Sequence, residues 1–304
     1  MNTSKLINRL TSEFTAVLGR PVEITRYDPA GGGCINSALR VYLDDGATFF
    51  VKWNSCAPAN MFGCEAEGLL AMQKATSLRV PTPILVGEPT AETPAFLVLE
   101  DLANPSRTQR RVSRDKFDEE LAAGLAEMHR FCGPAFGFYH DNYIGTTPQS
   151  NEWLNSWVEF FRSRRLEHMV KLLCGSGKIS SDDAKLWLQF LNRLDDLLVD
   201  AEAQPVLLHG DLWGGNVMCD SDGKPALIDP ACYFGHREAD LAMTELFGGF
   251  SPHFYKIYGE ILPLSDGYRE RFAIYNLYHL LNHAYLFGGG YLHQAMSIMR
   301  RYIR

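Results

Sequence analysis

Residues 209–216 read His-Gly-Asp-Leu-Trp-Gly-Gly-Asn, and residues 228–230 read Ile-Asp-Pro. The first stretch places Asp211 five residues before Asn216, and Asp229 follows thirteen residues later. This pattern is typical of a loop for metal-assisted phosphoryl transfer. An Asp at the first position can accept the proton of an attacking hydroxyl group, and the other two side chains offer oxygen donors to a Mg²⁺ ion between the phosphates of ATP. We therefore predict that Asp211 is the catalytic base and that Asn216 and Asp229 are metal ligands.

The triplet His-Gly-Asp alone is weak evidence, because Gly-Asp is common in ordinary turns. The wider context is more specific. Apolar runs at 206–208 and 226–228 lead into the two Asp residues, and Asp222-Gly223 between them is a hairpin signal. Protein kinases use a related loop, H-R-D-x-x-x-x-N, followed by D-F-G. Here Gly210 stands in place of the Arg, and Pro-Ala follows Asp229. This variant favours a kinase of small molecules over one that is switched by phosphorylation of an activation loop.

The composition is that of an ordinary globular protein. The chain has 304 residues, of which 46% are hydrophobic and 21% charged. A formal net charge of -7 argues against a general nucleic-acid binder. The seven cysteines include no C-x-x-C pair, which favours a reducing compartment over a disulfide scaffold or zinc site. The first twenty residues lack the apolar core of a signal peptide, and no run of eighteen apolar residues occurs. We therefore expect a cytoplasmic protein without nucleic-acid or membrane partners.

The periodicity of hydrophobic residues predicts an α+β protein with two lobes. We expect a small antiparallel β-rich lobe at 1–100 and a larger, mainly helical lobe at 101–304. In the first lobe the patterns predict helices at 5–18 and 60–75 and strands at 22–27, 38–43, 48–53, 84–86 and 95–99. In the second lobe they predict helices at 115–131, 153–173, 182–198, 237–247 and 268–286, interrupted by the catalytic hairpins at 206–233.

The first lobe carries residues suited to binding ATP. Gly31, Gly32 and Gly33 lie between two predicted strands, where backbone N–H groups can approach phosphate closely, although a glycine triplet is most often a flexible loop. It does not match the pattern of a P-loop NTPase.

Lys52 lies in an apolar strand and is either a solvent-facing edge residue or a phosphate ligand held by a carboxylate. Glu65 on the next helix is the preferred partner. Glu67 is its rival, rotated by about 200° around the helix. Backbone groups of Glu100 and Leu102, at the lobe boundary, are candidates for hydrogen bonds to adenine.

Three further residues have candidate supporting roles. His209 is expected to position the catalytic loop rather than to act as the base. His129 reads as a packed histidine at a helix end. Asp240 is expected to accept hydrogen bonds from the backbone of the catalytic loop, or else to stabilise the dipole at the start of its own helix.

Taken together, these motifs resemble the fructosamine kinases, also called ketosamine-3-kinases, which are related to aminoglycoside and choline kinases. The resemblance covers nearly the whole chain and is most specific in the run from Asp229 to Met243. The matching stretches are 31–36, 50–52, 61–65, 79–81, 208–216, 229–231, 235–243 and 275–283.

The resemblance implies a protein-kinase-like fold and a reaction. In this family ATP phosphorylates the 3-hydroxyl group of a ketosamine, a ribulosamine or fructosamine that is free or on a protein lysine. The product then breaks down and releases the amine, which is deglycation. By motif, Asp211 would be the base, Asn216 and Asp229 would bind Mg²⁺, and Lys52 with Glu65 would hold the phosphates of ATP.

Other assignments stay open at this point. Trp213 is either a wall against the sugar or a packing residue. Asn282 and His283 are candidates to donate hydrogen bonds to sugar hydroxyls, with a core-facing position as the alternative for His283. Cys34, beside the glycine triplet, is either inert or a redox-sensitive thiol. We expect a monomer, with a disulfide-linked dimer through Cys34 as an alternative. Two other functions remain: a kinase of another small hydroxyl compound, such as an aminoglycoside or choline, and a nucleotide-binding pseudokinase.

Overall fold

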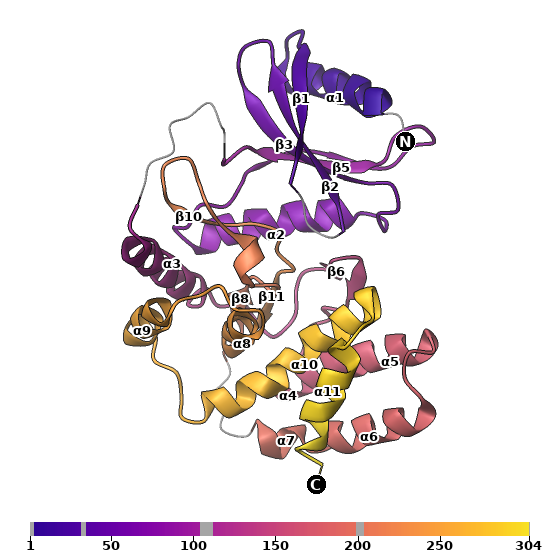
Figure 1. The fold of residues 1–304 in the computed structure, drawn as a ribbon, viewed down its shortest axis with the longest axis vertical. Coiled ribbons are helices and arrows are strands. Elements are labelled where there is room, and N and C mark those ends of the chain that lie inside the picture. Colours follow the sequence, from indigo (N-terminus) through magenta and orange to yellow (C-terminus); the bar gives the residue numbers. More distant parts are fainter. Residues whose placement is uncertain (1–2, 32–34, 104–111, 199–203, 304) are drawn as a thin grey trace.

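The computed structural model describes residues 3–31, 35–103, 112–198 and 204–303. Within these residues the N-terminal part of the chain forms a five-stranded antiparallel sheet in the order β1-β2-β3-β5-β4, seen at the top of Figure 1. Its strands are β1 (Ile24–Ala30), β2 (Ser37–Leu43), β3 (Thr48–Asn54), β4 (Pro83–Gly87) and β5 (Ala95–Glu100). Strand β3, which carries Lys52, therefore lies in the middle of the sheet and not at an edge.

The central strands are buried on both faces, because a helix covers each side of the sheet. Helix α1 (Thr3–Leu18) packs Leu6, Leu10 and Phe14 against one face. Helix α2 (Met61–Ala75) covers the other. Successive side chains of β5 point to opposite faces of the sheet. Phe96 and Val98 belong to the cluster under α1, and the residues that face α2 are Ala95, Leu97 and Leu99. In β3 the same alternation places Val51 on the face toward α1 and the neighbouring Lys52 on the face toward α2.

The rest of the chain is mainly helical and forms the lower part of Figure 1. Its helices are α3 (Arg114–Met128), α4 (Trp157–Phe160), α5 (Glu167–Gly175), α6 (Ser181–Leu191), α7 (Leu194–Leu197), α8 (Glu238–Leu246), α9 (Pro252–Ile261), α10 (Tyr268–Phe287) and α11 (Tyr291–Arg300). A π-helical turn, η1 (Phe161–Leu166), joins α4 to α5. Helix α10 runs through the core, with twelve of its residues buried.

The catalytic motifs lie on short strand pairs between these two parts. Strand β8 (Val206–Leu208) pairs with β11 (Tyr233–Gly235), and β9 (Val217–Cys219) pairs with β10 (Pro225–Leu227). A 3₁₀ turn, η2 (Gly214–Asn216), precedes β9. The predicted turn at Asp222-Gly223 therefore joins β9 to β10. The two apolar runs before Asp211 and Asp229 do not pair with each other, because each pairs with a different strand.

The predicted α+β fold is confirmed, with local corrections. The first strand runs on to Ala30. The helix predicted at 153–173 starts at Trp157, and the one predicted at 182–198 breaks after Leu191. The sequence reading missed α9, α11 and the hairpin of β6 (Asn142–Ile144) and β7 (Thr147–Gln149). The boundary between the two lobes near residue 100 stays a prediction.

Candidate active site

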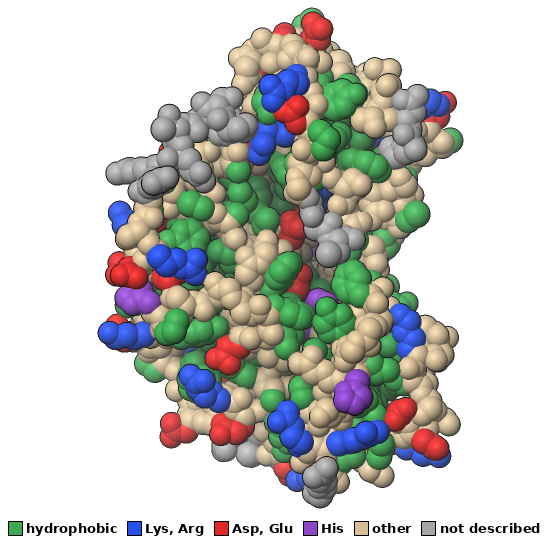
Figure 2. All heavy atoms as spheres, viewed as in Figure 1, with side chains coloured by type: hydrophobic (Ala, Val, Ile, Leu, Met, Phe, Trp, Pro, Cys, Tyr) green, Lys and Arg blue, Asp and Glu red, His purple; other side chains and the backbone are tan. Residues whose placement is uncertain are grey.

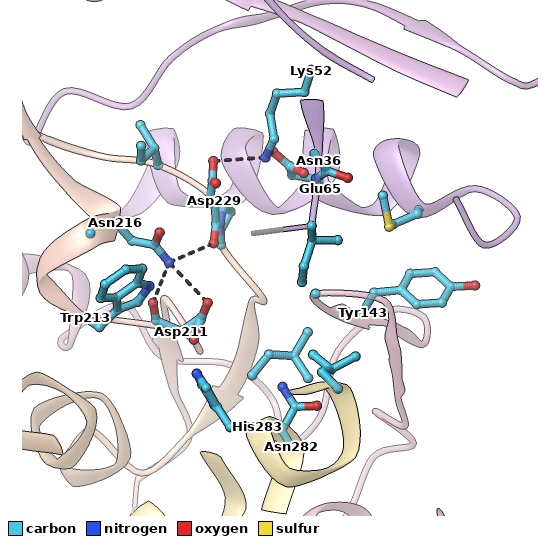
Figure 3. Close-up of a pocket in the computed structure, with 18 of the residues that line it drawn as sticks. Asn36, Lys52, Glu65, Tyr143, Asp211, Trp213, Asn216, Asp229, Asn282 and His283 are labelled. Atoms are coloured by element: carbon cyan, nitrogen blue, oxygen red, sulfur yellow. Dashed lines mark hydrogen bonds and ion pairs between the residues drawn. The ribbon is translucent and has the colours of Figure 1, made fainter. Parts of the chain in front are cut away.

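The predicted catalytic residues line one cavity of about 620 Å³ between the sheet and the helices. Figure 2 shows the hollow from outside, with acidic side chains inside it and hydrophobic ones around its mouth. Figure 3 shows its interior, with Lys52 at the top, Glu65 and Asp229 on either side of its nitrogen, and Asp211 below. The lining comes from β3, α2, the catalytic loop, α10 and the loop of β6 and β7. Residues more than 150 positions apart in sequence are thus gathered in one space.

Lys52 is bound by two carboxylates. Its Nζ atom lies 2.6 Å from Oε1 of Glu65 and 3.0 Å from Oδ1 of Asp229, and the residue is only 6% exposed. Burial alone would lower the pKa of Lys52, but the charges of Asp229 and Glu65 outweigh burial and raise it. The ammonium group is therefore charged and fixed at the top of the cavity, and the alternative of a solvent-facing lysine is wrong.

The helix geometry separates the two candidate partners of Lys52. Glu65 faces the sheet, whereas Glu67 turns outward and binds Nε2 of His140 at the surface, with a side chain that is 56% exposed. Glu65 is thus the partner, and Glu67 is not.

Asn216 links the two Asp residues. Its Nδ2 atom donates to the backbone oxygen of Asp211 at 2.8 Å and to the Asp211 carboxylate at 3.2 Å, and it reaches the backbone oxygen of Asp229 at 3.5 Å. Because the amide nitrogen is used in this way, Oδ1 of Asn216 and the carboxylate of Asp229 are the oxygen donors that remain for a cation.

This donor set fits Mg²⁺. No group of three or more His, Cys, Asp or Glu residues that could hold a metal occurs among the described residues. Mg²⁺ is commonly bound through one or two protein oxygens, with waters and substrate phosphates completing its coordination.

The environment of Asp211 changes its proton affinity. Burial at the floor of the cavity, assisted by the negative charges of Asp229 and Asp240 and opposed by the hydrogen bond from Asn216, raises the pKa of Asp211 to about 7. A carboxylate with a raised pKa is a stronger base than an ordinary Asp, which suits proton abstraction near neutral pH.

His209 and Asp240 support the catalytic loop from below. The backbone N–H groups of His209 and Gly210 donate to the two carboxylate oxygens of Asp240, at 2.7 and 2.9 Å. Nε2 of His209 donates to the carbonyl oxygen of Ile228 at 2.9 Å, and Nδ1 accepts from the backbone N–H of Asp211 at 3.3 Å. Burial lowers the pKa of His209, so its ring is neutral. The imidazole thus ties the segment before Asp229 to Asp211 and does not face the cavity as a base.

His129 is a buried residue at the end of α3, as the sequence reading expected, but it also extends this support. Its ring joins Asp240 to the hydroxyl group of Tyr258 on α9, at 3.2 and 2.8 Å.

The lower half of the cavity is polar on one side. Asn282 is 2% exposed, lines the cavity, and has a side-chain oxygen without a hydrogen-bond partner among the described residues. His283 beside it uses Nδ1 to donate to the carbonyl oxygen of His279 at 2.8 Å. Burial lowers the pKa of His283, so Nε2 carries a lone pair and accepts hydrogen bonds. Figure 3 shows both side chains pointing up toward Asp211. The expectation that His283 donates is therefore corrected: the ring presents an acceptor.

Several predicted nucleotide-binding residues are not gathered into this cavity. Gly31 lines it, but Gly32, Gly33 and Cys34 lie outside the described residues. Glu100 and Leu102 do not line it. The Glu100 carboxylate binds Arg79 at 2.6 Å, and the Leu102 carbonyl accepts from the backbone N–H of Ser221 at 2.9 Å. Their contact with adenine stays a prediction.

The sequence reading missed other lining residues, because their patterns are those of ordinary packing. Phe247 directly follows helix α8, and Tyr291 is the first residue of α11. Tyr143 lies on a three-residue strand. Trp213, which was predicted, lines the same part of the cavity and is 40% exposed.

Comparisons with known proteins identify the family of the chain. The family model described as fructosamine kinase matches residues 6–304. The chain belongs to the fructosamine kinase family. A protein-ribulosamine 3-kinase of rice (Oryza sativa subsp. indica), named as chloroplastic, is 41% identical over 292 residues, which cover 94% of this chain and 81% of the relative.

Solved structures show the same fold. The crystal structure of a protein assigned as a fructosamine-3-kinase from Haemophilus somnus superposes with a TM-score of 0.84 at 29% identity, covering 97% of both chains. An ADP-bound aminoglycoside phosphotransferase superposes with a TM-score of 0.58 at 13% identity, covering 95% of this chain and 97% of its own. The second likeness shows the protein-kinase-like fold alone. Within the part of the fructosamine kinase chain that the structure describes, no helix is long and apolar enough to span a membrane.

Proposed function

We propose that the protein transfers the γ-phosphoryl group of ATP to the 3-hydroxyl group of a ketosamine, a ribulosamine or fructosamine whose amine is free or is a protein lysine. The observation that carries the proposal is the cavity itself. It joins a fixed ammonium group, a pair of oxygen donors for Mg²⁺ and a carboxylate of raised pKa to a polar region suited to a sugar. The names of the relatives support the ketosamine as the acceptor.

Each residue has a separate part in the reaction. Lys52, held by Glu65, binds the phosphates of ATP. Asn216 and Asp229 would hold Mg²⁺, which when bound neutralises charge on the phosphates. Asp211 accepts the proton of the acceptor hydroxyl group. Phosphoryl transfer needs little covalent work from the protein, so positioning and charge are the main contributions of these residues.

The acceptor side is built to bind a polyhydroxylated chain. The side-chain amide of Asn282, whose nitrogen points toward Asp211 in Figure 3, can donate hydrogen bonds to hydroxyl groups, and the lone pair of His283 can accept them. When an analogue lacks a hydroxyl group, its polar partner in the site is left unpaired. The site therefore discriminates strongly against that analogue. These contacts favour a sugar over choline, which offers a single hydroxyl group.

A cytoplasmic location and a monomeric state belong to the same proposal. The described cysteines are free thiols, as in proteins of a reducing compartment. Oxidation of Cys34, including an intermolecular disulfide, remains a separate hypothesis. It is wrong if the Cys34→Ser variant loses activity under oxidant as fast as the parent protein.

The test is product identification. The protein is incubated with ATP, Mg²⁺ and either ribulosyl- or fructosyl-lysine, and a panel of aminoglycosides and choline is run in parallel. We expect ADP release that depends on the ketosamine, with the new phosphate on the 3-hydroxyl group by NMR. ADP release with only an aminoglycoside or choline would move the protein to another kinase class. Nucleotide binding without transfer to any acceptor would indicate a pseudokinase.

A further inference from the structure

Three aromatic side chains surround His283 at the mouth of the cavity. Phe247 lies 4.8 Å from the His283 ring, Tyr291 lies 5.1 Å and Phe287 lies 5.6 Å from it, all between ring centroids. Trp213 extends the group, with its ring edge-on to Phe247 at 6.4 Å. All four line the cavity. We call Trp213, Phe247, Phe287 and Tyr291 the aromatic rim.

The aromatic rim leaves an unusual amount of apolar surface in contact with water. Trp213, Phe247 and Phe287 are 40%, 39% and 48% exposed, and they come from the catalytic loop, the end of α8 and the end of α10. Single exposed hydrophobic side chains are normal, but their convergence from separate elements beside a cavity indicates a surface for a ligand.

The charged residues of the cavity lie outside the rim. The carboxylates in the lining are Glu65, Asp211 and Asp229, and two of these bind Lys52. The rim contributes none, and the His283 ring among its side chains is neutral because burial lowers its pKa. A cation that enters by the rim therefore meets aromatic faces, which attract an ammonium group, and no competing positive charge.

Another part of the lining is tightly packed. A Cβ atom at Gly145 would lie 2.5 Å from Cδ1 of Ile35 and 3.1 Å from Cδ1 of Leu286. A ketosamine carries its nitrogen on C1, two carbons from C3, so with the 3-hydroxyl group at Asp211 the nitrogen lies close to the catalytic loop that carries Trp213. The substituent on that nitrogen is therefore within reach of the rim.

We propose, resting on the function proposed above, that the aromatic rim is the subsite for the amine side of the ketosamine. Its ring faces hold the secondary ammonium group and the alkyl chain beyond it, such as the methylenes of a lysine side chain. Asn282 and His283 hold the sugar. The rim thus sets which amines are accepted, and it favours an alkyl chain of several methylenes over a short or anionic substituent.

The test uses ketosamines with one sugar and different amines. Wild-type protein is assayed with fructosyl derivatives of n-hexylamine and methylamine. We expect kcat/KM to be about tenfold higher for the hexyl compound, through a lower KM, because several methylenes leave water on binding. In Phe287→Ala the preference falls to less than about threefold. In Phe131→Ala, a residue of similar exposure (41%) outside the cavity, it stays unchanged.

A second pair of compounds separates the contribution of the ammonium group from that of the alkyl chain. Phe247→Leu keeps apolar volume but removes the ring face. We expect it to weaken binding of the hexylamine derivative more than binding of the corresponding 1-O-hexyl ketose, which has no ammonium group. Equal kcat/KM for hexyl and methyl compounds in the wild type, or equal losses for both in Phe287→Ala, would overturn the assignment of the rim while leaving the ketosamine reaction intact. If no ketosamine is phosphorylated at all, the proposed function fails and this inference fails with it.

Discussion

Lys52 and Asp229 are 177 residues apart in the chain, yet Nζ of Lys52 lies 3.0 Å from Oδ1 of Asp229. The contact spans the two parts of the molecule, because Lys52 lies on the central strand β3 and Asp229 follows β10. Nζ of Lys52 thus contacts a residue proposed as a metal ligand, and Oε1 of Glu65 binds the same ammonium group at 2.6 Å.

The first prediction concerns Glu65 and uses Glu67 as its matched control. Glu65→Gln removes the carboxylate that holds Lys52, which leaves the ammonium group to bind Asp229 alone. We expect kcat/KM for ATP to fall by about tenfold to a hundredfold, which corresponds to about 1.4 to 2.7 kcal/mol, because the ammonium group is no longer held in position by a second carboxylate. Steady-state kinetics at varied ATP measures it.

Glu67→Gln makes the same chemical change two residues away on the exposed side of α2. It should alter kcat/KM for ATP by less than about twofold, because surface ion pairs contribute little. Equal losses in the two variants would mean that Glu65 acts through helix stability and not through Lys52.

The contrast between Glu65 and Glu67 shows where sequence reasoning stops. Periodicity placed both residues on one helix and showed that only one could face the sheet. It could not choose between them, because the rotation of α2 is set by packing of residues such as Phe62 and Leu69 against strands far away in sequence. By contrast, the apolar run of β5 and the spacing of the catalytic loop are local patterns, and they were readable directly.

The residues of the aromatic rim other than Trp213 were missed for the same reason. Phe247 and Phe287 each lie at the end of a helix, where a single aromatic residue is compatible with ordinary packing. Only the arrangement of α8, α10 and α11 in space brings them around His283. Likewise, a sequence cannot tell whether a histidine donates or accepts, because that depends on the carbonyl oxygen of His279 that Nδ1 meets.

The second prediction is a pH dependence. The pKa of Asp211 is raised to about 7, and a base must be deprotonated to act. We therefore expect kcat/KM for the ketosamine to be constant above about pH 8 and to fall below about pH 7, approaching tenfold per pH unit. Measurement between pH 5.5 and 9 tests it. Asp211→Asn should lose most turnover, keep nucleotide binding and lose this inflection. An unchanged inflection in that variant would assign the pKa to another group.

The third prediction is that Asp211 destabilises the free protein at alkaline pH. The pKa of Asp211 is raised on folding, so the folded state resists ionisation until about pH 7, whereas an unfolded Asp ionises near pH 4. The loss in free energy of unfolding caused by Asp211 therefore grows between about pH 4 and pH 7 and reaches its full size above pH 7. The free energy of unfolding of Asp211→Asn, relative to the parent, should therefore be higher at pH 8 than at pH 5 by on the order of 2 kcal/mol. Urea titrations at the two pH values measure it. A difference that does not depend on pH would contradict the raised pKa.

The last prediction explains why glycine follows His209 where protein kinases have arginine. Gly210 has φ +81°, a conformation that disfavours side chains, and a Cβ atom there would lie 2.0 Å from the carbonyl oxygen of Ala231. That carbonyl belongs to the backbone two residues after Asp229. Gly210→Ala should therefore force apart the loops of Asp211 and Asp229, with a loss of stability of about 3 kcal/mol or more and a fall in kcat of at least about a hundredfold.

Gly46 provides the matched control. It has nearly the same backbone conformation, φ +85°, but a Cβ atom there would meet nothing within 4 Å. Gly46→Ala should cost only the backbone term of about 1 kcal/mol and leave kcat unchanged. Thermal unfolding and steady-state kinetics of both variants separate strain from contact. Because the two substitutions share the backbone penalty, equal effects would show that the approach of the two catalytic loops does not depend on the missing side chain.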